Sequence, residues 1–496
     1  MQRYTNRCLR KFSSDTRKSY CSKLFNEMRE NLKLELSNYK GNISIACDLF
    51  TGSNYKCYIC VTAHYIDSNW TMQKRIIAVR MLKNPSKTDH IFKYLMEIFN
   101  EFGVLNKIFS LAFDNVSGYD DVIEMLITSL EPPFDAKLFH VSHFFNIISS
   151  IARDGLALVE THVRNIRMAL KFISSSQSRQ KEFGEICESF NLKNRRFVDD
   201  DTNPRWNSTY LMLQSCKDYR DAITDFYHKK QSQYFLSDDD WNIAFTFMKF
   251  MLCFHVTIKY SSPHSIILHF YNISKSFSEY RNNESIAHIC DTMEKKFLKY
   301  WEDIPILFAL SIVMDPRIKL SALEYYLNQI SKNLNIESKI KIDDVSSLSH
   351  EMYSNYATKY KNMNHRDFTY EGEDKILLLL KEIHSLRSNS STNELSTYLE
   401  TNIAHEDLNL GVLNWWKLHE WKYPILSIMA RDLLTLPVST QASESDLRAR
   451  NKILEERRNL LTSEMFECMV CLKDWQNMEL DAITYNNEYF EIEDDD

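Results

Sequence analysis

The spacing of apolar residues predicts that the chain starts with a helix followed by a small antiparallel sheet. Apolar side chains recur every three or four positions over residues 16–39 and stop at Gly41, which is typical of an amphipathic helix. Residues 42–50, 56–67 and 72–82 then read as strands separated by short polar turns. Three successive strands joined by tight turns indicate an antiparallel meander.

After the meander the pattern alternates between helix and strand. Residues 88–102 and 117–130 have helical spacing, whereas residues 107–113 and 136–141 have the short apolar runs of strands. A strand, a helix and another strand placed after a meander predict a mixed sheet with parallel additions.

The rest of the chain is helical almost without interruption from residue 144 to about residue 433. Candidate helices cover residues 150–173, 209–227, 238–260, 266–280, 285–301 and 320–334. Residues 364–373 and 388–393 are interpreted as loops, and residues 435–475 as one long helical run.

Composition agrees with a packed, mostly helical protein. The 496 residues include only 8 Gly and 9 Pro, which favours long regular elements. The longest apolar run, residues 304–314, is shorter than the roughly 20 residues that cross a bilayer. The first twenty residues lack the apolar core of a secretion signal. We therefore expect an intracellular protein without a membrane partner.

Charge is distributed unevenly along the chain, which has a net charge of -7. Residues 1–40 carry ten Lys and Arg against four Asp and Glu, whereas residues 476–496 carry eight acids and no base. The acidic end predicts a solvated, disordered tail. An acidic balance argues against nonspecific coating of nucleic acid but allows a locally basic channel.

The eleven scattered cysteines predict reduced thiols rather than a disulfide framework. Cys57 with Cys60 and Cys468 with Cys471 have the spacing of metal ligands. Positions three apart in a strand point to opposite faces, and the second pair has no nearby partners to complete four ligands. We interpret both pairs as core thiols and expect no structural zinc.

Two aspartates, each near the end of a predicted strand, indicate a possible metal site. Asp48 shares one face of the first strand with the small residues Ser44 and Ala46, and Asp114 ends the fourth strand. Ligand sites in such sheets favour the carboxyl ends of strands. A third acid from a packed helix, for which Glu444 is the candidate, would complete an oxygen-rich pocket suited to Mg or Mn.

Each of these acids also has an ordinary structural explanation. Asp114 precedes a predicted helix start, where an aspartate commonly caps the turn. Glu444 lies near the start of a predicted helix, where an acid faces the positive end of the backbone dipole. From the residues alone, both interpretations stay open.

Four blocks of sequence resemble the hAT superfamily of DNA transposases, in particular its plant Ac-like and RICESLEEPER-like members. The blocks are ISIACDLFTGSNYKCYICVTAHYID at residues 43–67, FSLAFDNVSGYDDVIEML at 109–126, NPRWNSTYLML at 203–213 together with residues 294–320, and residues 394–445. The resemblance implies an α/β RNase H-like catalytic domain interrupted by a large all-α insertion, in a chain that is predominantly helical. On this basis the chain divides into an N-terminal helical lead-in (1–41), the first part of the sheet (42–143), the helical insertion (144–393), the C-terminal dimerisation region with the returning catalytic helix (394–476) and the acidic disordered tail (477–496).

The resemblance also implies roles for individual residues. It makes Asp48, Asp114 and Glu444 both the catalytic residues and the ligands of a two-ion Mg or Mn site. The residues that it places near DNA are His143, Arg205, Trp206, Arg448 and Arg450. The residues that it places in the dimerisation segment are Trp415, Trp416, Tyr423 and Pro424.

Several of these residues have a second interpretation from the sequence itself. Trp415 and Trp416 on a helix could pack into the core of a single subunit instead of an interface. Arg448 and Arg450 are interleaved with acids, so they could belong to a solvated helix face. The family signature at residues 315–317, Asp-Pro-Arg, has the physical role of a helix break.

The sequence departs from the family pattern at several positions. Nothing in these residues supplies the BED zinc finger that the family usually carries at its N-terminus. Residues 139–143 lack the Cys of a family motif, Phe50 stands where Trp is usual, Tyr119 replaces Asn, and Arg450 and Asn451 replace a Gly pair. These departures favour a repurposed protein, whereas the complete set of acids favours an enzyme.

Two functions are therefore predicted. The first is a hAT-type transposase or transposase-derived protein of the nucleus, which binds DNA, forms a homodimer or larger assembly, and uses a metal-dependent site for phosphodiester cleavage and strand transfer. The alternative is a domesticated, non-catalytic nuclear protein that binds DNA and dimerises. Neither requires a small-molecule cofactor, and the sequence leaves open whether the chain is an enzyme.

Overall fold

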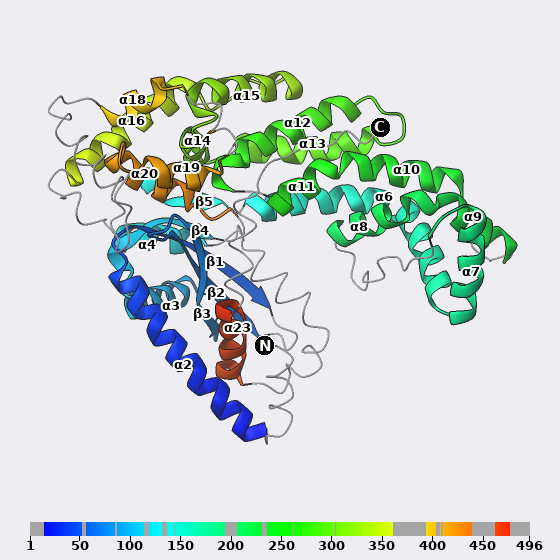
Figure 1. Cartoon of the computed structure of the whole chain (residues 1–496), viewed down its shortest axis with the longest axis horizontal. Coiled ribbons are helices and arrows are strands. Elements are labelled where there is room, and N and C mark those ends of the chain that lie inside the picture. Colours follow the sequence, from blue (N-terminus) through cyan, green and yellow to red (C-terminus); the bar gives the residue numbers. More distant parts are fainter. Residues whose placement is uncertain are drawn as a thin grey trace.

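The computed structural model describes most of the helices and all five strands of one sheet (Figure 1). The described residues are 14–51, 56–84, 87–113, 119–130, 136–142, 144–193, 206–230, 236–260, 262–302, 304–360, 393–402, 407, 410–438 and 462–476.

The sheet has the strand order β3-β2-β1-β4-β5. Its strands are β1 (Ile43–Thr51), β2 (Cys57–Ile66), β3 (Met72–Leu82), β4 (Ile108–Phe113) and β5 (His140–Ser142). The first three strands pair antiparallel, whereas β4 pairs parallel to β1 and β5 pairs parallel to β4. The predicted mixed sheet, a meander with parallel additions, is confirmed.

Four helices pack against the sheet and form one hydrophobic core with it. These helices are α2 (Ser14–Asn38), α3 (Thr88–Glu101), α4 (Asp120–Leu130) and, from the far end of the chain, α23 (Ser463–Gln476). In α3 the apolar residues Ile91, Leu95, Ile98 and Phe99 recur at helical spacing and are all buried in this core. The periodic pattern thus selects the face that each helix turns toward the sheet.

The remaining helices form a second, larger core that also reaches β5 and the β2–β3 hairpin. They are α6 (Phe144–Ser174), α7 (Gln177–Ser189), α8 (Trp206–Cys216), α9 (Arg220–Lys229), α10 (Asp238–Phe250), α11 (Leu252–Tyr260), α12 (Ile266–Tyr280), α13 (Ala287–Glu302), α14 (Ile306–Val313), α15 (Lys319–Leu334), α16 (Ile342–Lys359), α18 (Glu394–Glu400), α19 (Val412–His419) and α20 (Pro424–Leu434). In Figure 1 helices α6–α13 extend as an arm beside the sheet, and α14–α20 gather over one end of it.

Several predicted elements differ from the structure. The single helices expected over residues 209–227 and 238–260 are each divided, the first into α8 and α9 and the second into α10 and α11. Residues 136–141 were expected to form a strand, but Ala136–Phe139 form the short helix α5 and only His140–Ser142 pair with β4. The expected helix over residues 435–475 is wrong at its start, because α20 ends at Leu434 and residues 435–438 are not helical. Pro437 lies in this stretch and cannot continue a helix.

Some predicted segments fall outside the described residues. They include the loops at 364–373 and 388–392, most of the run that contains Glu444, and the acidic tail at 477–496. Within the described ranges, no single helix is long and apolar enough to cross a membrane, and α10 with α11, bent by 40° at their junction, pass that test only as a pair.

Candidate functional site

Asp48 lies near the end of β1 on one side of the sheet. Alternation along the strand places Ser44, Ala46, Asp48 and Phe50 on this side, which we call the acid face. Asp48 is 7% exposed, and it pairs across the antiparallel ladder with Cys60. Burial and, to a smaller extent, the charge of Asp48 raise the pKa of the Cys60 thiol, so this thiol stays protonated at neutral pH.

The parallel pairing of β1 with β4 brings the positions before the two predicted aspartates side by side. Ala46 pairs with Ala112, and Cys47 pairs with Phe113, which is the last residue of β4. Asp48 is the next residue of β1, and Asp114 follows Phe113 in the sequence. Asp114 itself lies outside the described residues.

The chain on both sides of Glu444 contacts the acid face. Upstream, the hydroxyl oxygens of Thr435 and Ser44 are 3.0 Å apart and hydrogen-bonded. Downstream, the ring of Phe466 on α23 packs against Phe50, with 6.3 Å between ring centroids. Glu444 lies outside the described residues, but the segment that carries it leaves and rejoins the described structure on this one face.

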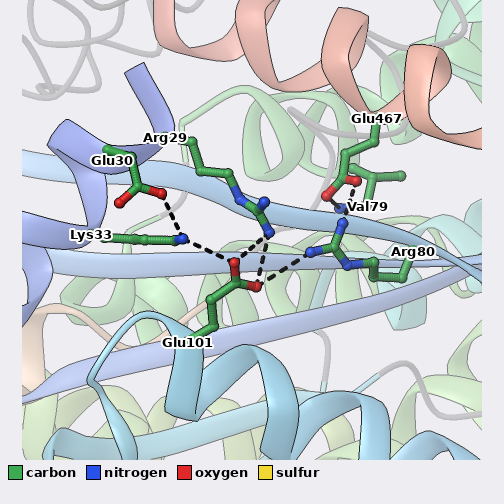
Figure 2. Close-up of polar contacts among 7 residues, drawn as sticks. All are labelled: Arg29, Glu30, Lys33, Val79, Arg80, Glu101 and Glu467. Atoms are coloured by element: carbon green, nitrogen blue, oxygen red, sulfur yellow. Dashed lines mark hydrogen bonds and ion pairs between the residues drawn. The ribbon is translucent and has the colours of Figure 1, made fainter. Parts of the chain in front are cut away.

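Helix α23 is held on the sheet by a network of charged residues (Figure 2). Glu467 of α23 accepts hydrogen bonds from the Arg80 guanidinium and, at 3.4 Å, from the main-chain amide of Val79. Arg80 also reaches Glu101 at the end of α3, where the Nη2–Oε2 distance is 3.3 Å. Arg29 of α2 donates to the same Glu101 carboxylate at 2.8 Å. The network joins four elements and fixes the returning helix.

The same helix covers the outer edge of β3. The main-chain amide of Ile76 donates to Asp474 at 2.8 Å, and the indole of Trp475 donates to the carbonyl of Ile76 at 2.9 Å. An edge strand presents unpaired main-chain groups, and side chains of α23 satisfy the amide and the carbonyl of Ile76 on β3.

Three of the four residues predicted to lie in the dimerisation segment are buried in the core of the subunit. Trp415 and Trp416 are 5% and 0% exposed, Tyr423 is also buried, and Pro424 is the first residue of α20. The indole of Trp416 donates to the carbonyl of Met314 at 2.8 Å. The side chains of Trp415, Trp416 and Tyr423 therefore shape this segment from within, and their role in pairing two subunits stays a prediction.

Of the residues predicted to lie near DNA, the structure describes one. Trp206 is the first residue of α8 and is 6% exposed, packed into the core of the helical arm. The others, His143, Arg205, Arg448 and Arg450, lie outside the described residues. The proposed DNA contacts of all five stay a prediction.

A buried polar joint between the sheet and α20 was not predicted from the sequence. Asp432 accepts a hydrogen bond from the side-chain amide of Asn42 at 2.5 Å and another from the hydroxyl of Tyr356. Beside it, the guanidinium of Arg431 lies 3.9 Å from the ring centroid of Trp70. Burial raises the pKa of Asp432 to about 6. These partners are up to 390 positions apart, so no local pattern signals them.

The described residues do not by themselves form a metal centre. Among them, no three His, Cys, Asp or Glu side chains are arranged to hold an ion. Of the three predicted ligands only Asp48 belongs to this set, whereas Asp114 and Glu444 do not.

The fold defines a structural class. A sheet of three antiparallel strands extended by two parallel ones, a large helical insertion and the returning helix α23 are the features of an RNase H-like fold. Comparison with protein families places it more narrowly. Residues 394–476 match the hAT family C-terminal dimerisation region, and residues 266–356 match the hAT-like transposase, RNase-H fold. Residues 46–137 and 141–250 match the ZBED1 RNase-like domain and its helical domain. Over residues 266–356 and 394–476 the chain is therefore similar to the hAT family of transposases.

Individual relatives are similar along nearly the whole chain. The putative AC transposase of Zea mays is 28% identical over 499 residues, which cover 95% of this chain and 61% of that protein. The zinc finger BED domain-containing protein RICESLEEPER 3 of Oryza sativa subsp. japonica is 28% identical, over 93% of this chain and 64% of its own length. DAYSLEEPER of Arabidopsis thaliana is 26% identical, over 90% and 65%. The chain thus spans less than two thirds of the length of these relatives.

Proposed function

We propose that this chain is a hAT-type transposase or transposase-derived protein whose Asp48, Asp114 and Glu444 hold divalent metal ions for DNA phosphodiester cleavage and strand transfer. The observation that carries the proposal is the parallel pairing of β1 and β4 up to the positions directly before Asp48 and Asp114. The contacts of Thr435 and Phe466 with the acid face support a place for Glu444 on the same side of the sheet.

The donor set suits the proposed ions. Carboxylate oxygens are hard ligands, which Mg and Mn prefer. When bound, such ions activate a water or a 3' hydroxyl and stabilise the leaving oxygen. The described chain supports this arrangement in two ways: β1 and β4 pair in parallel up to the residues before Asp48 and Asp114, and α23, which follows Glu444 in the sequence, is docked on the sheet.

The proposed partners are DNA and a second copy of the chain, in the nucleus. The match of residues 394–476 to the hAT dimerisation region supports self-association. The residues proposed to contact DNA are His143, Arg205, Trp206, Arg448 and Arg450. Sedimentation velocity tests the self-association, and imaging of a fluorescently tagged chain tests the nuclear location.

Calorimetric titration with Mn tests the metal site directly. The variant Asp48→Asn removes one ligand charge with almost no change in size. Asp121→Asn is the matched control, because Asp121 is an exposed carboxylate on the neighbouring helix α4. We expect wild type and Asp121→Asn to bind Mn alike, and Asp48→Asn to bind it at least about tenfold more weakly, since a carboxylate ligand is lost.

Equal titration of all three proteins would remove the enzyme interpretation. The non-catalytic DNA-binding and dimerisation protein would then be the remaining function. Circular dichroism of Asp48→Asn must match wild type, which separates loss of a ligand from loss of the fold.

A further inference from the structure

Helix α14 ends against the C-terminal segment, by which we mean residues 393–438. The last carbonyl groups of a helix have no partner within it. Two such groups at the end of α14 accept hydrogen bonds from this segment: the hydroxyl of Tyr398 donates to Val313 at 2.9 Å, and the indole of Trp416 donates to Met314 at 2.8 Å. The C-terminal segment thus caps α14.

The chain that follows α14 caps the C-terminal segment in return. The ammonium group of Lys319 donates to the carbonyl oxygens of Tyr398, at 2.5 Å, and of Thr401, which is the C-cap residue of α18. The same group lies 4.7 Å from the ring centroid of Tyr398. A lysine is well suited to this position, because a cation stabilises the negative end of a helix.

The Asp-Pro-Arg signature builds the turn that presents Lys319. The buried carboxylate of Asp315 accepts from the main-chain amide of Arg317 at 3.0 Å and from its guanidinium at 2.7 and 2.5 Å. The carbonyl of Asp315 accepts from the main-chain amides of Ile318 and Lys319. Pro316 prevents α14 from continuing. The three residues therefore form a closed turn with its charges paired internally.

Lys319 adopts a backbone conformation that is unfavourable for its residue type. Its φ is 53°, in the left-handed region that residues with a Cβ rarely occupy. Burial, together with the nearby charge of Lys422, also lowers the pKa of its amine to about 8. A strained and partly desolvated residue persists where the surrounding contacts require it.

We propose that the turn of residues 315–319 is a latch that sets the position of the C-terminal segment on the helical domain, with Lys319 as the positioning residue. The Asp-Pro-Arg signature forms the turn, and Lys319 donates hydrogen bonds to the carbonyl groups at the end of α18. The latch joins two stretches that match separate hAT regions, residues 266–356 and 394–476. The function proposed above includes self-association through residues 394–476, so we expect the latch to affect self-association as well. That expectation rests on the proposed function, whereas the effect of the latch on the docking of α18 does not.

Hydrogen exchange on the full-length chain tests the latch, with three variants. Lys319→Met removes the charge and keeps a long, unbranched side chain. Lys319→Gly removes the hydrogen bonds to α18 and also relieves the backbone strain. Lys319→Arg retains donors that can reach the same carbonyls. Lys295→Met, at an exposed position on α13, is the matched control.

We expect residues 393–402 to exchange about tenfold faster or more in Lys319→Met and Lys319→Gly, because charge-assisted hydrogen bonds at the end of α18 are lost. Peptides from β1, β2 and α12 should exchange as in wild type, and Lys319→Arg should recover most of the protection. A residue that served only local backbone packing would instead give a Lys319→Gly variant with unchanged or stronger protection of residues 393–402.

Two results would overturn the proposal. One is wild-type exchange of residues 393–402 in both Lys319→Met and Lys319→Gly. The other is an equal rise in exchange over residues 393–402 and the sheet, since Lys319 would then support the whole fold. Sedimentation velocity of the same variants separates the latch from the proposed self-association. Faster exchange of residues 393–402 with unchanged association would support the latch and argue against pairing of two subunits through this segment.

Discussion

The buried carboxylate of Asp432 predicts an unusual dependence of stability on pH. Its ordinary pKa is 3.8, and burial raises this to about 6, although hydrogen bonds from Tyr356 and Asn42 oppose the change. A carboxyl whose pKa is raised on folding stabilises the folded state below its unfolded pKa. That stabilisation is lost as the pH rises through the folded pKa.

The size of the effect follows from the two pKa values. One pKa unit corresponds to about 1.4 kcal/mol, so a rise from 3.8 to about 6 corresponds to about 3 kcal/mol in the free energy of unfolding. About 1 kcal/mol of this is already lost at pH 4.5, where the unfolded carboxyl is largely ionised. About 2 kcal/mol therefore remains to be lost between pH 4.5 and pH 8.

Urea unfolding of wild type and Asp432→Asn at pH 4.5 and pH 8 measures this difference. An amide does not ionise, so the free energy of unfolding of Asp432→Asn relative to wild type should increase by about 2 kcal/mol from pH 4.5 to pH 8. Asp343→Asn, which changes an exposed carboxylate on α16, should keep the wild-type pH dependence. If Asp432→Asn and wild type change in parallel, Asp432 does not titrate in this range, and the reasoning from burial fails.

Two further substitutions test how the helices are docked. Glu467→Gln should lower the free energy of unfolding by about 1–3 kcal/mol, because the Arg80 guanidinium loses its charged partner on α23; unchanged urea unfolding would mean that the network of Figure 2 does not hold this helix. Gly155→Ala should cost about 1–3 kcal/mol, because the added Cβ would lie 2.1 Å from the sulfur of Met293 where α6 packs on α13. Thermal denaturation measures the second effect, and a variant as stable as wild type would show that Met293 moves aside freely.

Much of the fold is predictable from local patterns. The strand at Met72–Leu82 and the helix at Ile266–Tyr280 agree with prediction at both ends. The strand has a continuous apolar run and the helix a helical period, and polar residues bound both. The short stretch at 136–141 was misassigned, because a few apolar residues fit either period. The prediction of a continuous helix over residues 435–475 did not account for Pro437, whose ring interrupts a helix whatever the flanking pattern.

The site was less accessible to sequence reasoning. Local alternation correctly placed Asp48 on a face with small residues, since side-chain direction in a strand depends only on position. Whether Trp416 lies in a subunit core or an interface depends on what covers it, and the structure buries it inside the subunit. The bond between Asn42 and Asp432 joins residues 390 positions apart, which only the folded chain brings together.

The cover that α23 provides for β3 has a consequence for biosynthesis. The ribosome makes this helix more than 380 residues after the strand that it protects. Until then the nascent chain presents a bare strand edge, which is a template for pairing with neighbouring polypeptides. Chaperone demand and aggregation of polysome-bound or prematurely terminated chains should therefore fall sharply once the last helix has been synthesised and has docked.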